Sequence, residues 1–174
     1  MELENLARQG TVNVIVGFYG LTGYLDWCED RDPAEVLDLA EAYFAYTGIA
    51  IEVAGGSLVK PVGDAGLCLF PPDDPDTVLT GVVEMKRRTD AWLAECGYRH
   101  PIRVGLAIGT VAVGRVGAPG RERLDVYGET VNRAGTLKGR PVAVTGAFAA
   151  KLGDDWRARL TPFGDGEFVL ADGA

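Results

Sequence analysis

Three short segments of the chain carry residue types that can do chemistry. The first runs from Gly17 to Gly23 and is rich in glycine, which lets backbone N–H groups turn toward an anion ahead of a helix. The second, Lys60-Pro61-Val62-Gly63-Asp64, brings a cation and a carboxylate to one short turn. The third, from Leu124 to Asn132, holds Asp125 inside an apolar run, where a carboxylate needs a partner because burying an unpaired charge is costly.

Each segment also has a plainer interpretation. The glycines could form nothing more than a tight strand-to-helix turn, since loose glycine spacing is a weak signal. Asp64 could serve only its turn, and Lys60 could be a solvated charge at a sheet edge. Asp125 could face outward from its strand, and Asn132 could be a surface residue of a helix. The choice between a functional and a purely structural interpretation depends on whether the three segments belong to one site.

Composition limits the classes of function. The chain has 174 residues, 17 of them basic and 25 acidic, for a net charge of −8. We expect a single domain over residues 1–174 that does not bind nucleic acid, because an acidic chain lacks the basic surface that phosphate backbones need. His100 is the single histidine, and three cysteines without a CxxC pair predict reduced thiols. No apolar stretch suggests a signal peptide or membrane span, which predicts a cytoplasmic protein.

The elements that must position these segments follow from the apolar patterns. We predict strands at 12–16, 57–60, 65–70 and 102–108, and long helices from Pro33 to Val53 and from a cap at Asp76 to Cys96. This order, βαββαβ, predicts an α+β, ferredoxin-like core with a mainly antiparallel sheet and both long helices on one face. Further strands at 124–127 and 142–145, a helix at 129–137 and a terminal hairpin within 156–170 complete the expectation.

Together the segments resemble the class III nucleotidyl (adenylate/guanylate) cyclase catalytic domain. The resemblance runs from residue 11 to residue 132, and more loosely to residue 153. Five ordered motifs carry it: 14–22 resembles the family's first strand and phosphate turn, 60–64 its K-x-x-G-D hairpin, 103–109 its R-x-G-I-x-x-G strand, 114–121 its dimerisation arm, and 124–132 its F-D-V-W-G-D-T-V-N segment.

The resemblance implies a reaction and a substrate. In the family, the ribose 3′-hydroxyl of a nucleoside triphosphate attacks the α-phosphate and pyrophosphate leaves, at sites shared by two chains in a head-to-tail dimer. Lys60 matches the base-reading lysine, and Asp125 matches the acceptor for the adenine amino group, which favours ATP. Asn132 matches the ribose-orienting asparagine. Phe18, Tyr19, Gly20, Leu21 and Thr22 would line the phosphates.

The same resemblance implies a metal site with Mg²⁺ or Mn²⁺, and here the match is incomplete. Asp64 matches one metal aspartate, but the other falls on Gly17. The transition-state arginine falls on Thr136, with Lys138 or Arg133 as conceivable replacements. The tail 161–166 lacks the family's phosphate-binding lysine.

These departures predict a degenerate cyclase domain that is inactive or very weak alone and binds a nucleotide or a partner cyclase domain. Two alternatives stay open. The chain could be a weak adenylate cyclase that converts ATP to cAMP and pyrophosphate as a homodimer or heterodimer, or it could be a structural interaction module. The arm at 114–121, with little of its own to pack on, predicts contact with a second chain.

Overall fold

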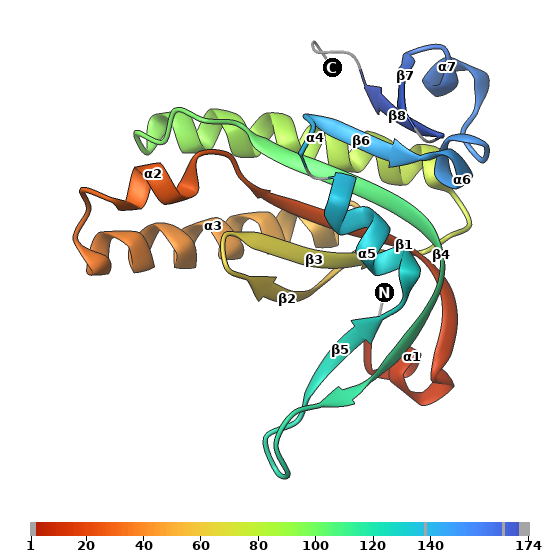
Figure 1. The fold of residues 1–174 in the computed structure, drawn as a ribbon, viewed down its shortest axis with the longest axis horizontal. Helices are drawn as coiled ribbons and strands as arrows, with labels where there is room; N and C mark the ends of the chain where they lie inside the picture. The colour runs from red at the N-terminus through yellow and green to blue at the C-terminus, as the bar shows by residue number, and fades with distance from the viewer. Residues whose placement is uncertain (1–2, 138, 165, 171–174) are drawn as a thin grey trace.

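The computed structural model describes residues 3–137, 139–164 and 166–170, and it contains one mixed sheet with helices on both faces (Figure 1). The elements in chain order are α1 (Leu3–Gln9), β1 (Thr11–Leu21), α2 (Tyr24–Cys28), α3 (Pro33–Val53), β2 (Ser57–Val62), β3 (Ala65–Phe70), α4 (Pro75–Glu95), β4 (Ile102–Val116), β5 (Arg123–Tyr127), α5 (Glu129–Leu137), β6 (Val142–Thr145), α6 (Gly146–Ala149), α7 (Asp154–Arg157), β7 (Leu160–Gly164) and β8 (Glu167–Leu170).

The predicted ferredoxin-like core is confirmed. The strands lie in the order β2-β3-β1-β4-β6-β8-β7, and β5 pairs with β4 outside this path. The first four of these strands are antiparallel neighbours, and β6 joins β4 in parallel. This order is the one that a βαββαβ chain adopts when both helices cross the same face of the sheet.

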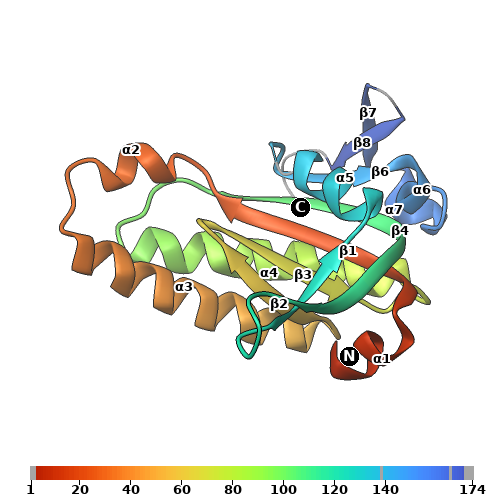
Figure 2. The ribbon, with the colours of Figure 1, turned by 60° about the horizontal axis from the view of Figure 1, so that its bottom comes forward.

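Two apolar layers hold the sheet between helices. Figure 2 shows α3 and α4 side by side on one face of the sheet and α5 on the other. The larger layer packs Ile15, Tyr19, Phe70 and Leu106 from the strands against residues of α3 and α4. The smaller layer packs Val14, Val16 and Leu67, among others, with Val131 and Ala134 of α5. Because β3 lies between both layers, all six of its residues are buried.

The first strand is longer than the sequence predicted. We expected a strand over residues 12–16 and a glycine-rich turn from Gly17 to Gly23, but β1 continues to Leu21 with partners on both sides. The turn begins only at Thr22 and Gly23, and Gly23 has φ +68°, which favours glycine. The glycines at 17 and 20 therefore lie in a central strand, where they allow close packing rather than a bend.

Other boundaries differ modestly from expectation. Helix α4 begins at Pro75 because Asp74, not Asp76, caps it by accepting a hydrogen bond from the Thr77 N–H at 3.0 Å. Asp76 instead accepts hydrogen bonds from the Gly153 N–H. The predicted bounds of α5 and β6 are confirmed, whereas the short helices α1, α2, α6 and α7 were not predicted. None of the helices in the described residues is both long and apolar enough to span a membrane.

The predicted arm is a β-hairpin. Strand β4 extends to Val116 and pairs with β5 from Arg123, so the hairpin projects away from the body of the molecule (Figure 1). Its base contacts α1, where Arg115 forms an ion pair with Glu4 at 3.0 Å and the Val113 N–H bonds the Gly10 carbonyl. Val116 and Tyr127 on the hairpin are about half exposed. Contact of this arm with a second chain stays a prediction.

Candidate active site

The most defined polar contact of the candidate site joins two residues 65 positions apart. The Lys60 ammonium on β2 donates to Asp125 Oδ2 on β5 at 2.5 Å. The Asp125 side chain is only 12% exposed, and its Oδ1 also accepts a hydrogen bond from the Val126 N–H at 2.7 Å. Burial raises the pKa of Asp125, but the hydrogen bonds from Lys60, the Val126 N–H and the Tyr127 hydroxyl outweigh it and hold the pKa below its usual range.

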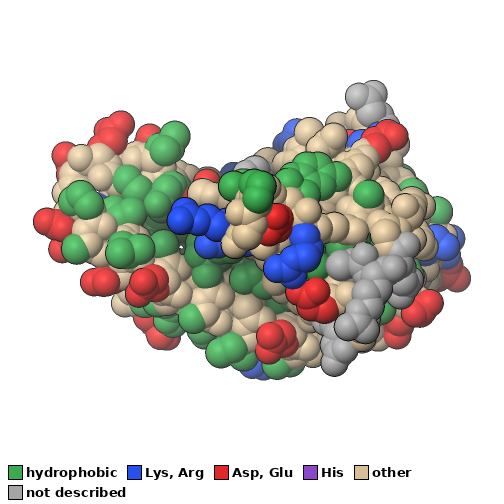
Figure 3. All heavy atoms as spheres, turned by 90° about the horizontal axis from the view of Figure 1, so that it is seen from below, with side chains coloured by type: hydrophobic (Ala, Val, Ile, Leu, Met, Phe, Trp, Pro, Cys, Tyr) green, Lys and Arg blue, Asp and Glu red, His purple; other side chains and the backbone are tan. Residues whose placement is uncertain are grey.

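This ion pair lies on a large groove between β2 and the arm. The groove has a volume of about 1030 Å³ and is lined by both Lys60 and Asp125, by Glu4 of α1 and by Arg121 and Arg123 at the arm's end. Figure 3 looks at the molecule from the side of the arm and shows Lys and Arg side chains gathered near the middle of that face. The structure thus brings together the two residues that the sequence assigned to base recognition.

Asp64 lies in a different cavity. It follows Gly63 in the turn between β2 and β3 and lines a cleft of about 320 Å³ with Gly20, Arg103 and Thr136. Among the residues that the structure describes, the two cavities have no lining residue in common. Within one chain, therefore, the groove of Lys60 and Asp125 is separate from the cleft of Asp64.

Arg103 is a residue whose part in this cleft the sequence analysis missed. It was noted only as the first position of the R-x-G strand motif. Its Nε donates to Thr22 Oγ1 at 3.0 Å, and its Nη1 donates to the Gly139 carbonyl at 2.8 Å. These bonds hold a guanidinium at the wall of the Asp64 cleft, where a phosphate group could meet it.

The assignment of a lost carboxylate to Gly17 is not supported by the geometry. A Cβ on Gly17 would lie 2.6 Å from Cys68 Sγ and 3.3 Å from carbons of Leu106 and Phe70, inside the layer under α3 and α4. A Cβ on Gly20 would instead lie 3.3 Å from Asp64 Oδ2. Successive residues of a strand point to opposite faces, so Gly20 faces Asp64 and Gly17 does not.

The candidate site residues of α5 lie on two sides of the helix. Asn132 is exposed, and Thr136, one turn later, lines the Asp64 cleft. Arg133 forms an ion pair with Glu167 of β8 at 3.3 Å and lines a separate pocket beside Thr145. Arg133 therefore does not take the place of an arginine at position 136, and Lys138 lies outside the described residues.

Fewer residues of the segment Phe18 to Thr22 can contact a ligand than the sequence suggested. The Tyr19 ring is fully buried, and its hydroxyl shares a hydrogen bond with Thr47 Oγ1 at 2.9 Å, so this side chain cannot contact a ligand. Phe18 is half-buried and packs near Gly135 of α5. Gly20, Leu21 and Thr22 remain at the Asp64 cleft, the last through its bond to Arg103.

The βαββαβ core, the carboxylate at the β2–β3 turn and the projecting β4–β5 hairpin together define a class of protein, the nucleotidyl cyclase catalytic domains. The family model of the adenylate and guanylate cyclase catalytic domain matches residues 6–146, and the chain belongs to this family.

Similarity to individual proteins supports that membership. The chain is 30% identical over 152 residues to an adenylate cyclase of Anabaena cylindrica, covering 77% of this chain and 30% of that protein. It is similar in fold to the adenylyl cyclase CyaB from P. aeruginosa, with a TM-score of 0.76, 18% identity and coverage of 94% and 96%. The guanylate cyclase domain of RhGC from Catenaria anguillulae in complex with GTP gives a TM-score of 0.78 at 18% identity, with coverage of 90% and 92%. The chain spans less than a third of the length of the Anabaena relative.

Cyclases of this class generally use Mg²⁺ or Mn²⁺, and the residues here do not fit a pair of such ions. Hard divalent cations prefer several oxygen ligands, above all carboxylates. The cleft offers the carboxylate of Asp64, and the position that faces it is Gly20, which has no side chain. Among the described residues, no group of three or more His, Cys, Asp or Glu side chains could hold a metal ion.

Proposed function

We propose that this chain is a nucleotide-binding cyclase domain with little or no turnover of its own, and that it supplies the base-recognition half of a shared site to a second cyclase domain. The nucleotide is a nucleoside triphosphate, with ATP favoured. The single observation that carries the proposal is the contrast between an assembled Lys60–Asp125 pair and an Asp64 that faces a glycine.

The base-recognition half is supported by chemistry as well as resemblance. An ammonium can donate only and an ionised carboxylate can accept only. Lys60 and Asp125 therefore present one donor and one acceptor side by side, which suits the ring nitrogen and the amino group of adenine. Guanine presents a carbonyl oxygen where adenine has the amino group, and a carboxylate would repel it.

Turnover needs more than base recognition. Contacts that bind substrate and transition state equally do not speed the chemical step. The reaction forms a bond from the 3′-oxygen to the α-phosphorus and breaks the bond to pyrophosphate, so negative charge must be stabilised at both oxygens. Gly20 opposite Asp64 adds no second carboxylate to hold a cation, and Thr136 on the cleft wall carries no charge of its own. These positions therefore cannot supply the positive charge that would stabilise the two oxygens. In related phosphoryl transfers, an arginine at the transition state contributes about 10³- to 10⁵-fold in rate.

The separation of the two cavities supports a second chain. Lys60 and Asp125 line the groove beside the arm, while Asp64 lines the other cleft. A ligand that needs both kinds of residue would have to lie between two protomers, with the groove of one facing the cleft of the other. A partner with complete metal carboxylates would then restore the metal half of one site out of two, and that site would still lack the arginine that Thr136 replaces.

A weak adenylate cyclase is the second candidate, and Arg103 favours it. This guanidinium, held by Thr22 and Gly139, already lines the cleft of Asp64 and could neutralise part of the phosphate charge. The Anabaena relative is named an adenylate cyclase, and the chain spans 30% of its length.

Two measurements on the purified chain test the proposal. Isothermal titration calorimetry with ATP and GTP should detect binding that is stronger for ATP and is lost in Lys60→Ala. An assay for cAMP with ATP and either Mg²⁺ or Mn²⁺ should stay at background. Clear cAMP formation that disappears in Asp64→Ala would favour the weak cyclase instead. A folded chain that binds neither nucleotide would make it a structural module.

A further inference from the structure

Tyr127 contacts Asp125, which together with Lys60 forms the proposed base-recognition pair. Neither the sequence motif nor the groove lining indicates this contact. The Tyr127 hydroxyl donates to Asp125 Oδ2 at 3.1 Å. The two residues are two positions apart on β5, so their side chains leave the strand on the same face. Tyr127 does not line the groove, and 53% of it is exposed. It reaches the site only through Asp125.

The hydrogen bonds on Asp125 show what this contact does. Oδ2 accepts from both the Lys60 ammonium and the Tyr127 hydroxyl, and Oδ1 accepts from the Val126 N–H. A carboxylate offers about four lone-pair positions. Among the described residues, three of these positions are occupied, which leaves one on Oδ1 for a ligand. The Tyr127 bond is thus part of what orients the free acceptor.

We infer that Tyr127 is a positioning residue for nucleobase recognition: its hydroxyl holds Asp125 as an oriented, ionised acceptor, so that the site takes a base with an exocyclic amino group and rejects one with a carbonyl there. This inference rests on the proposed nucleotide binding. It adds a specificity determinant outside the groove, since the phenol contacts Asp125 and not the ligand.

The neighbourhood of Asp125 is mixed in charge, which matters for any pH readout. Lys60 on β2 and Tyr127 on β5 bond the carboxylate directly. Other charged groups line the same groove: Glu4 on α1, Glu52 on α3, and Arg121 and Arg123 on the arm. None of these four bonds Asp125 in the described structure. Removing the Tyr127 hydroxyl therefore removes one specific donor and leaves the surrounding charges in place.

The test uses Tyr127→Phe, which keeps the ring and removes the hydroxyl alone. Tyr46→Phe is the matched control, because Tyr46 stacks on Trp92 on the helical face and does not line the groove. Calorimetry should show ATP affinity reduced by up to about ten-fold in Tyr127→Phe, because binding must then order an Asp125 side chain that the hydroxyl no longer holds. The preference for ATP over GTP should narrow by a similar factor. Tyr46→Phe should match the wild type.

A second readout needs no nucleotide. A carbon-13 NMR titration of the Asp125 carboxyl should show a higher pKa in Tyr127→Phe than in the wild type, because a donor to the ionised form is gone. An unchanged Asp125 pKa in Tyr127→Phe would overturn the inference. A raised pKa with an unchanged ratio of the affinities for ATP and GTP would also overturn it. If the wild type binds no nucleotide at all, the proposed function fails and the inference fails with it. If Lys60→Ala abolishes binding while Tyr127→Phe leaves it intact, the proposed function stands and only the inference is wrong.

Discussion

Gly20 faces Asp64 so closely that a Cβ added to the glycine would lie 3.3 Å from the carboxylate oxygen. The backbone at Gly20 is extended and paired with strands on both sides. A side chain at this position therefore meets no backbone strain, unlike at the positive-φ glycines of the turns, and requires the Asp64 carboxylate to move by a few tenths of an ångström. The lack of a second carboxylate beside Asp64 results from residue type alone, and the fold still presents a place for one.

The two glycines of β1 should respond oppositely to the same substitution. Gly17→Asp should lower the free energy of unfolding by about 3 kcal/mol or more, because its side chain would collide with buried Cys68 and carry a charge into the core. Gly20→Asp should fold with a cost of about 1 kcal/mol. Urea unfolding of both variants measures the difference. Equal destabilisation would show that the pleat of β1 differs from the one described.

Metal binding should separate Gly20→Asp from the wild type. Gly20→Asp would place two carboxylates together, so millimolar Mn²⁺ should raise its Tm by binding the folded state. In the wild type, Asp64 is the one carboxylate among the described residues that line the cleft, so the wild type should show a smaller shift, and EDTA should remove the effect. If Mn²⁺ raises the Tm of the wild type equally, the cleft already holds a metal without position 20.

Lys60→Ala should separate binding from stability. Because Lys60 is 40% exposed and Asp125 keeps its hydrogen bonds from the Val126 N–H and the Tyr127 hydroxyl, the ion pair should contribute about 1 kcal/mol or less to folding. Affinity for ATP should nevertheless fall by at least ten-fold, since the donor to the base is lost. Lys86→Ala is the control, because Lys86 makes an ion pair of the same 2.5 Å length with Asp90 on α4. An equal loss of ATP affinity in both variants would count against a base-recognition role.

Arg103→Ala should weaken binding of phosphates rather than of the base. ATP affinity should fall about ten-fold or more, as expected for a charge-assisted bond, while adenosine affinity should change little. Arg133→Ala serves as the comparison, since Arg133 pairs with Glu167 away from the cleft. Calorimetry with both ligands measures the effect. A loss that is equal for adenosine and ATP would mean that Arg103 only supports the fold.

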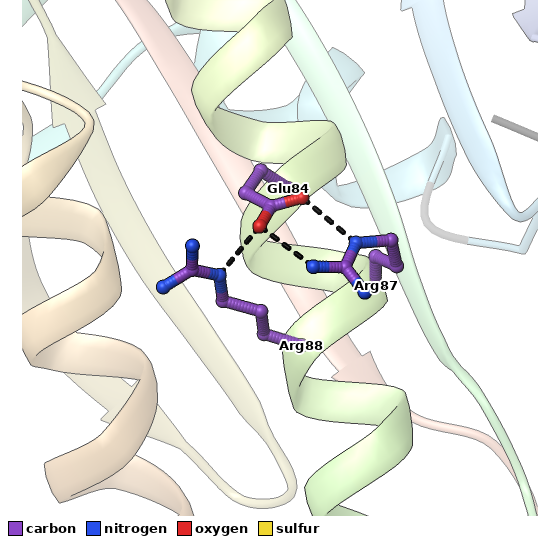
Figure 4. Close-up of polar contacts among 3 residues, drawn as sticks. All are labelled: Glu84, Arg87 and Arg88. Carbon is purple, nitrogen blue, oxygen red and sulfur yellow. Dashed lines mark hydrogen bonds and ion pairs between the residues drawn. The ribbon is translucent and has the colours of Figure 1, made fainter.

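A cluster on the opposite, helical face gives a pH dependence that is independent of the site. Glu84 accepts hydrogen bonds from Arg87 and Arg88 at 2.5–2.8 Å (Figure 4), and these lower its pKa from about 4.5 to about 2. Because the folded pKa is the lower one, the stabilisation is present above about pH 4.5 and is lost as the pH falls toward 2. The Tm of Glu84→Gln should be lower than that of the wild type at pH 7 and equal to it at pH 2. High salt should shrink the difference because the cluster is exposed.

The sequence was sufficient for the order of the elements, because apolar periodicity located both long helices. The family resemblance assigned Lys60 and Asp125 to one function, and the structure brings the two side chains into contact. Their part in base recognition stays a prediction. The sequence was not sufficient for β1, because three glycines at intervals of three residues allow several registers and a turn. Only the pleat shows that Gly17 faces Cys68 and Gly20 faces Asp64. Arg103 was noted for its motif alone, since its bonds to Thr22 and Gly139 depend on loops that pattern analysis cannot place.

The most direct test of the account is cAMP formation by the double variant Gly20→Asp, Thr136→Arg, checked first to be folded and dimeric. The first change adds a carboxylate facing Asp64, and the second adds a cation to the wall of the same cleft. Each single variant should stay near background, because the remaining defect still raises the barrier by several kcal/mol. The double variant should form cAMP with Mn²⁺ above the product of the single effects, and Gly17→Asp combined with Thr136→Arg should not. A folded, ATP-binding double variant that forms no cAMP, or a wild type that already forms it, would contradict the account.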